Sequence, residues 1–241
     1  KTYRGYALFR LHKMGDFSQL RQLLTIGWPM CIQFGGELIA FSLVTIFIGW
    51  LGESSLAALQ VVQQFLFLVI VPVFSISESV GILIGHDVGA RRWGDLRLTA
   101  DMSLLFALLL CLPLFFIFMV FPNTIASGYM DIHNPNNLKT LYLVHELLLL
   151  ACLNLLFDGI RNIMSGALRG LFDTRYAMWV GLLLIWLLSL PLGYLLSFYT
   201  TLGVLGFSIA QIVSYIIGFV LLYRYWLRIV GKRVCCDESQ A

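Results

Sequence analysis

The amino-acid sequence predicts an all-α fold, a polytopic bundle of membrane-spanning helices. Of its 241 residues, 59% are hydrophobic and only 12% are charged, which is about half the charged share of an ordinary soluble domain. Several uncharged apolar stretches exceed the roughly 20 residues that cross hydrocarbon as a helix. Because lipid offers no partner for free backbone N–H and C=O groups, each stretch is expected to be helical.

We expect six spans, of which the second and fourth are long enough to tilt or to project beyond the bilayer. In chain order, the spans are residues 24–49, 56–84, 98–121, 138–168, 177–198 and 205–222. Prolines inside or near these spans invite kinks, and they are Pro29, Pro72, Pro113 and Pro191. Two glycine pairs have the spacing that lets helices approach closely, namely Gly85 with Gly89 and Gly166 with Gly170.

The distribution of Lys and Arg orients the bundle. Fifteen of these residues, Arg161 included, fall on one side of the expected spans, and only Lys139 falls on the other. Both termini should therefore be cytosolic. Three regions follow from this: residues 1–20 as a basic cytosolic linker or amphipathic helix, residues 21–230 as a six-helix lobe, and residues 231–241 as a cytosolic tail.

Both ends of the chain suggest further features. The chain starts at Lys1 and not at Met, so we expect a fragment or one half of a longer protein. In the tail, Cys235-Cys236 follows basic residues, which suggests either palmitoylation or a disordered end. The basic residues fall at helix ends, so the net charge of +3 does not indicate a nucleic-acid partner.

Two carboxylates, Glu37 and Asp158, lie near the middle of expected spans. Glu37 follows Pro29, at the cytosolic start of the first span, by eight residues, and Asp158 precedes Arg169 by eleven. At about 1.5 Å per residue they lie about 12 Å and about 16 Å deep, near the midplane of a core about 30 Å thick. Because a carboxylate in hydrocarbon is costly, we expect both to serve a function.

Polar residues share helix faces with these acids. Gln33 lies on the stripe of Glu37, Asn154 lies on that of Asp158, and Gln211 has a similar register in the sixth span. We predict that these five residues line one shared cavity. The secondary candidates are Glu78, Gln64 and Arg161. For the amides, hydrogen bonding between helices is an equally good interpretation.

Two acids in a low-dielectric cavity suit a cation-linked step. Desolvation disfavours an ionised carboxylate and a nearby cation favours it, so such a site can exchange a proton for another cation. Carboxylate and amide oxygens also suit Na+, with Glu37 and Asp158 as candidate ligands. An organic cation would be attracted by the same charge and by aromatic walls such as Phe34, Phe41 and Phe157.

The sequence shows no enzyme motif. His145-Glu146 begins like the zinc protease box, but Leu149 stands where the second histidine is needed. There is no phosphate loop, no dinucleotide-binding glycine motif and no nucleophile elbow. We therefore predict a protein that is not an enzyme and has no cofactor beyond a coupling H+ or Na+.

Several segments resemble the multidrug and toxic compound extrusion (MATE) family. DGIRNIMSGALRGLFDT, at residues 158–174, is similar to the tenth helix of that family and the loop that follows, and GALRG is its most specific part. The first expected span resembles the seventh helix of the family at Pro29, Gln33, Glu37 and Phe41. Shorter similar segments are LAA at residues 56–58 with Gln60, residues 85–90, and GVLG at residues 203–206 with Gln211. The resemblance covers about residues 15–228.

The resemblance implies the C-terminal six-helix lobe of a twelve-helix antiporter in a plasma or inner membrane, with the N-terminal lobe as the missing partner. It implies cation coupling and substrate binding at Glu37 and Asp158, and export of organic cations or amphipathic drugs against an inward H+ or Na+ gradient. Arg161, one turn from Asp158, departs from the family pattern and could hold that acid ionised or occupy it structurally. Some bacterial branches place their key acid on the first helix of the family, outside this chain.

Three other functions stay open from the sequence. A lipid or lipid-linked precursor flippase would need a basic cavity for phosphate groups, whereas the mid-membrane excess here is acidic. An intramembrane enzyme would need two carboxyl groups close enough to share a proton. A truncated, inactive lobe would need neither feature.

Overall fold

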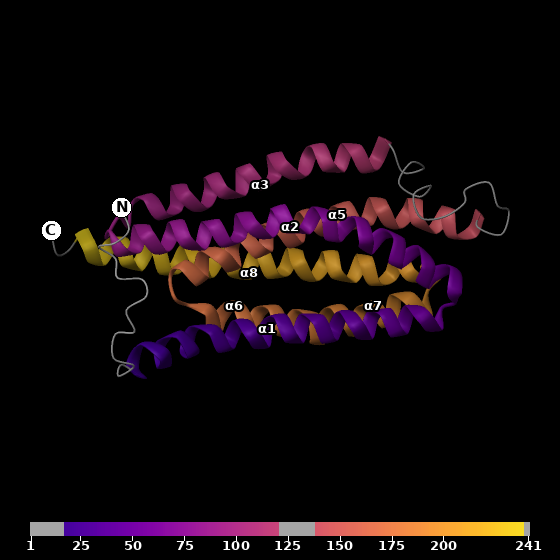
Figure 1. Ribbon diagram of the computed structural model, residues 1–241, viewed down its shortest axis with the longest axis horizontal. Helices are drawn as coiled ribbons and strands as arrows, with labels where there is room; N and C mark the ends of the chain where they lie inside the picture. Colours follow the sequence, from indigo (N-terminus) through magenta and orange to yellow (C-terminus); the bar gives the residue numbers. More distant parts are fainter. Residues whose placement is uncertain (1–16, 121–137, 239–241) are drawn as a thin grey trace, which may run out of the picture.

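The computed structural model describes residues 17–120 and 138–238, which form long helices with no strand among them (Figure 1). The first four helices are α1 (Phe17–Trp50), α2 (Glu53–Gly89), α3 (Asp95–Val120) and α5 (Leu138–Gly170). The remaining elements are α6 (Thr174–Leu183), the π-helical segment η3 (Leu184–Ser189), α7 (Leu190–Tyr199) and α8 (Val204–Glu238). Because α6, η3 and α7 follow one another without a break, they form one helical rod. The prediction of an all-α bundle is confirmed.

Five helical segments in the described part of the chain are long and apolar enough to cross a membrane. They are Leu24–Trp50, Val69–Gly89, Thr140–Gly170, Thr174–Tyr199 and Val204–Arg233, and each overlaps an expected span. Helix α3 covers the third expected span as far as Val120 but is not among the five, and several of its side chains lie outside the described part.

The ends of the chain are described only in part. Helix α8 continues past the expected end at Leu222 to Glu238, so the first residues of the expected tail belong to that helix. The side chains of Cys235 and Cys236 are outside the described part, as are residues 1–16 of the predicted linker.

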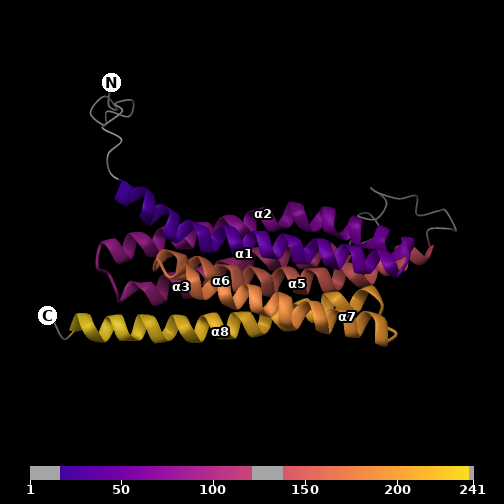
Figure 2. The ribbon, with the colours of Figure 1, turned by 90° about the horizontal axis from the view of Figure 1, so that it is seen from below.

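The rods run up and down the bundle, and short turns join α1 to α2, α2 to α3, α5 to α6 and α7 to α8. Gly52 (φ +117°) and Gly203 (φ +55°) end two turns at one end of the bundle, directly before α2 and α8, in backbone conformations that glycine adopts without strain. Figures 1 and 2 place the start of α1 and the end of α8 at the opposite end, with the α2–α3 and α5–α6 turns. The predicted alternation is therefore present, and the assignment of this end to the cytosol stays a prediction. Arg161 is an exception to the predicted distribution, because it lies inside the bundle and not at its end.

Helices α2 and α5 form the most extensive interhelical contact in the bundle. Gly166 lies directly against the backbone of Ser77, and a Cβ atom placed on Gly170 would lie 2.6 Å from the carbonyl oxygen of Gly81. The predicted close approach at Gly166 and Gly170 is confirmed. In the other predicted pair, a Cβ atom on Gly85 would lie 3.8 Å from the carbonyl oxygen of Gly170, whereas one on Gly89 would meet no atom within 4 Å.

Gly166→Ala should therefore destabilise the protein by about 1–3 kcal/mol, because the added methyl group would push α2 and α5 apart. Helix propensity alone predicts the opposite sign, since Ala favours a helix over Gly by about 1 kcal/mol. The measurement is thermal unfolding of the purified protein in detergent. Gly89→Ala is the matched control and should leave the melting temperature unchanged or slightly raised. Equal melting temperatures for the two variants would contradict the close contact.

The π-helical segment η3 ends two residues before Pro191. Proline cannot donate the usual backbone hydrogen bond, and its ring clashes with the carbonyl group four residues earlier, which favours a local widening of the helix. Pro29, Pro72 and Pro113 instead lie within uninterrupted helices. Of the four prolines, only Pro191 is thus accompanied by a change in hydrogen-bonding pattern.

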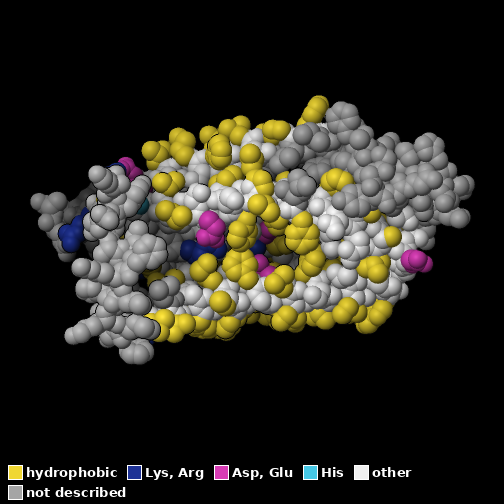
Figure 3. Space-filling view, viewed as in Figure 1, with side chains coloured by type: hydrophobic (Ala, Val, Ile, Leu, Met, Phe, Trp, Pro, Cys, Tyr) yellow, Lys and Arg dark blue, Asp and Glu magenta, His cyan; other side chains and the backbone are white. Residues whose placement is uncertain are grey.

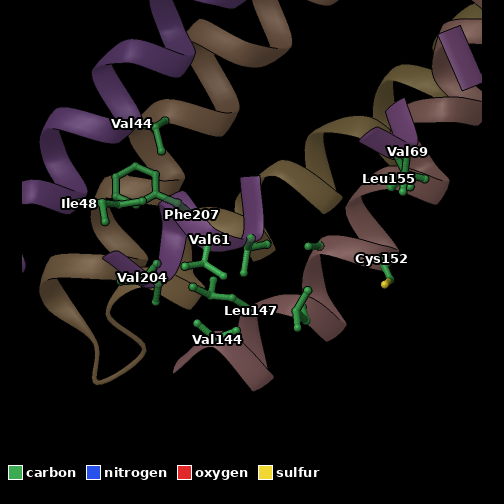
Figure 4. Packing of buried hydrophobic residues seen from close by; sticks show 14 of the residues in the cluster. Val44, Ile48, Val61, Val69, Val144, Leu147, Cys152, Leu155, Val204 and Phe207 are labelled. Atoms are coloured by element: carbon green, nitrogen blue, oxygen red, sulfur yellow. The ribbon is translucent and has the colours of Figure 1, made fainter. Parts of the chain in front are cut away.

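Two apolar clusters pack the bundle, one toward each end. Figure 4 shows the first cluster, in which Phe207 of α8 lies near Val44 and Ile48 of α1 and Val61 of α2. The second cluster includes Met164 and Leu168 of α5 and the fully buried Trp226 of α8. Where α5 passes from one cluster to the other it carries the polar residues Asn154, Asp158, Arg161 and Asn162, so the candidate site lies between two tightly packed regions.

Candidate functional site

A cavity of about 310 Å³ opens into the middle of the bundle. Figure 3 shows the face hollowed near its centre, with acidic and basic side chains among hydrophobic ones. The polar and charged lining residues are Glu37, Gln63, Asn154, Asp158, Arg161, Asn162, Ser189, Gln211 and Tyr215. They come from α1, α2, α5, η3 and α8, so the cavity exists only when these elements are assembled.

Arg161 lies between the two predicted acids and contacts both. Its Nε and Nη2 atoms donate to Asp158 Oδ1 at 3.2 and 2.8 Å. Its Nη1 and Nη2 atoms each lie 3.4 Å from Glu37 Oε1. Only 4% of the Arg161 side chain is exposed, against 15% for Asp158 and 22% for Glu37. The structure thus joins both acids through one buried guanidinium group.

Neighbouring side chains hold this cluster in place. Gln33 Nε2 donates to Glu37 Oε1 at 3.2 Å, and Asn162 Nδ2 donates to Asp158 Oδ2 at 3.1 Å. The guanidinium carbon of Arg161 lies 5.2 Å from the centre of the Tyr215 ring, within the range of a cation–π contact. Glu37 Oε2 accepts no hydrogen bond from the described residues, which leaves one carboxylate oxygen available to an occupant.

Two glycines make room for the buried arginine. A Cβ atom placed on Gly218 of α8 would lie 3.2 Å from Arg161 Cδ. A Cβ atom on Gly181 of α6 would lie 3.5 Å from Glu37 Oε1 and 3.6 Å from Arg161 Nη1. Larger residues at either position would compete with the charged cluster for space.

Most of the predicted site residues meet at this cavity. Glu37, Asp158, Asn154, Gln211 and Arg161 line it. Gln33 is buried and contacts Glu37 without being part of the lining.

Two secondary candidates lie elsewhere. Gln64 is exposed, and the preceding residue, Gln63, lines the cavity instead, because successive residues point about 100° apart around a helix. Glu78 pairs with Arg169 at 2.8 Å and is 48% exposed. It is separate from the cavity lining in the described part of the chain.

The aromatic wall was predicted in part. Phe34 and Phe41 line the cavity as expected, but Phe157 does not. Phe67 and Phe74 of α2 complete the wall, and the rings of Phe34 and Phe74 lie 5.5 Å apart. Phe67 and Phe74 follow Gln63 by four and eleven residues, which places all three on one face of α2. The sequence therefore predicts that they line the cavity if Gln63 does.

The donor set of the cavity suits a monovalent cation more than a tightly held metal. Among the described residues, no group of three or more His, Cys, Asp or Glu side chains could hold a metal ion. Asn154 donates from Nδ2 to the carbonyl oxygen of Ser208 at 3.2 Å, whereas its buried Oδ1 has no partner. This oxygen and Glu37 Oε2 are acceptors that Na+ or an N–H donor would satisfy.

The arrangement is not a pair of acids that share a proton. The guanidinium of Arg161 separates the carboxylates, and no hydrogen bond joins Glu37 to Asp158. Of the residues that line the cavity, these three are the charged ones, so its formal charge is −1. A negative, partly apolar cavity attracts a cation and offers little to a phosphate group.

Sequence comparisons agree with the motifs. A profile described as MatE matches residues 29–195. The chain is 33% identical over 226 residues to a "Probable multidrug resistance protein NorM" of a Synechococcus strain, covering 91% of this chain and 47% of that protein. A relative with the same description from a Synechocystis strain is 31% identical and covers 89% and 46%. The chain thus spans about half the length of these relatives.

Solved structures give the same fold. "Crystal structure of MATE in the straight conformation" aligns with a TM-score of 0.78 at 18% identity, covering 88% of this chain and 47% of that one. "Outward-facing conformation of a multidrug resistance MATE family transporter of the MOP superfamily" aligns at 0.71 and 21% identity, covering 86% and 44%. Family members are transporters, not enzymes. With the profile matching more than half of its length, this chain belongs to the MatE family.

Proposed function

We propose that this chain is the C-terminal lobe of a cation-coupled antiporter that exports organic cations or amphipathic drugs. The observation that carries the proposal is the mid-bundle cavity, which combines a net negative charge with walls of phenylalanine. A charge that is expensive in the membrane interior is retained where it binds something. An aromatic and acidic cavity attracts organic cations through both Coulomb and cation–π interactions.

We include a second lobe in the proposal because this chain is only about half as long as its relatives. The chain covers 47% of its Synechococcus relative, which is described as a probable multidrug resistance protein. Transporters built from two lobes alternate access by moving one lobe against the other around a central site. Binding of H+ or Na+ at the acidic cluster would neutralise the cavity and shift the balance between the outward-open and inward-open states. Glu37 and Asp158, supported by Gln33, Asn154 and Gln211, are the residues proposed for that role.

The alternatives fit the cavity less well. A lipid flippase needs positive charge for phosphate groups, but the single arginine is already paired with two acids. A carboxylate enzyme needs two acids in direct contact, but Arg161 lies between them. A truncated, inactive lobe is tested by the full open reading frame, in which six further hydrophobic spans before Lys1 would supply the partner lobe.

The experiment expresses the full open reading frame in a bacterium that lacks its main drug exporters. Membrane vesicles are loaded with ethidium, and efflux is followed by fluorescence after a Na+ or H+ gradient is imposed. We expect efflux with one of the two gradients and none after that gradient is collapsed. Efflux that needs ATP, or no efflux with either gradient, would contradict the proposal. Localisation of the protein in the plasma or inner membrane, also proposed here, is checked by fractionation of the same cells.

A further inference from the structure

We propose that Arg161 is the counter-cation of Asp158, so that Glu37, which Arg161 reaches only at 3.4 Å, carries the uncompensated negative charge and restricts the cavity to an occupant with one positive charge. This inference rests on the proposed function, because it names the charge class of the transported species. The resemblance to other family members assigns cation binding to both acids. The geometry around Arg161 instead separates the roles of the two acids.

The two contacts of Arg161 are unequal. Asp158 is three residues away on the same helix and receives two hydrogen bonds, the shorter at 2.8 Å. Glu37 is on α1 and is reached only at 3.4 Å. A pair within one helix is kept when helices move relative to one another, whereas a longer contact between α1 and α5 changes with their separation. We therefore expect the ion pair between Arg161 and Asp158 to persist when the helices move relative to one another during transport.

The surroundings prevent Arg161 from leaving this position. Its stem packs against Gly218, its guanidinium lies over the Tyr215 ring, and 4% of the side chain is exposed. The second oxygen of Asp158 is taken by Asn162 at 3.1 Å. Asp158 thus accepts hydrogen bonds at both oxygens from residues of its own helix.

Glu37 is in the opposite situation. Its Oε2 atom has no hydrogen-bond donor in the described part of the chain, and Phe34 and Phe41 of the same helix line the cavity beside it. Asn154 lines the same cavity, and its buried Oδ1 accepts no hydrogen bond from the described residues. One acidic oxygen, one neutral oxygen and aromatic walls match a single cation.

The charge balance sets the limit on the occupant. With Asp158 and Arg161 cancelling, one unit of negative charge remains, and a monovalent cation neutralises it. A divalent organic cation would leave an uncompensated positive charge in a low-dielectric site beside Arg161. Discrimination by charge is therefore expected without any change in the shape of the cavity.

The test compares ethidium with propidium, which share a ring system and carry one and two positive charges. Binding to the purified full-length protein is measured by fluorescence anisotropy. Wild type should prefer ethidium by about tenfold or more. Asp158→Asn combined with Arg161→Gln leaves the formal charge of the cavity at −1, so the preference for ethidium over propidium should persist. Arg161→Gln alone should shift the preference toward propidium by about tenfold.

Arg97→Gln combined with Asp101→Asn is the matched control, because it removes an exposed pair of the same charge type. It should change neither affinity. Loss of the preference for ethidium in the folded Asp158–Arg161 double variant would overturn the inference, because the net charge of the cavity would then not determine which cation binds. The double variant tests the inference even if the Arg161→Gln variant does not fold. If wild type binds neither dye, the proposed function falls, and this inference with it.

Discussion

Glu37→Gln is expected to abolish coupled export while the protein stays folded in the membrane. The substitution keeps the size of the side chain and removes the negative charge that Arg161 contacts only at 3.4 Å. Loss of one partner from a buried charged contact costs about 2–5 kcal/mol in binding, so transport should fall by at least about thirtyfold. The measurement is gradient-driven ethidium efflux from vesicles with matched amounts of protein.

Folding must be measured beside transport in this experiment. The Glu37 contact with Arg161 is long, and the side chain is 22% exposed, so Glu37→Gln should lower the melting temperature only slightly. Glu53→Gln, a change of the same type at the start of α2, is the matched control and should transport normally. Undiminished efflux by Glu37→Gln would show that the charge of Glu37 is not needed for transport.

The helical architecture could be predicted because its signal is repeated along every span. Long uncharged stretches, turns between them and the one-sided distribution of Lys and Arg all follow from the bilayer as a solvent. The packing partners of the helices were harder to predict. Gly166 and Gly170 were identified as close-contact residues, but their partners Ser77 and Gly81 depend on the relative rotation of α2 and α5, which no local pattern encodes.

The site was predicted as a set of residues but not as a geometry. The cost of burial selected Glu37 and Asp158, and helical spacing added Asn154 and Gln211, which the structure brings to one cavity. Arg161 was assigned both to the end of a span and to a possible pair with Asp158. Only the assembled bundle shows that it is buried and also contacts Glu37 from another helix. Gln64 was named as a candidate, but Gln63 lines the cavity. Neighbouring residues of a helix point about 100° apart, so an error of one residue is enough to miss the site.

The aromatic wall shows the same limit. Phenylalanine is frequent throughout this chain, with 18 residues, so composition gives no reason to prefer one over another. Phe157 directly precedes Asp158 and therefore points to a different face of α5, outside the cavity lining. Phe67 and Phe74 lie on the face of α2 that turns toward α1, and the sequence does not contain that rotation. Tertiary contacts between helices decide which aromatic residues face a substrate.

Asp158→Asn should cause a large loss of stability, because it leaves the buried Arg161 with only its longer contact to Glu37. Removal of one partner from a buried ion pair typically costs about 3–5 kcal/mol, since the remaining charge is left uncompensated. The expected order of melting temperatures in detergent is wild type, then Glu37→Gln, then Asp158→Asn. Adding Arg161→Gln to Asp158→Asn should recover most of the loss, because both charges are then absent. If the double variant were less stable than Asp158→Asn alone, Arg161 would stabilise the bundle through its packing on Gly218 and Tyr215 and not through its charge.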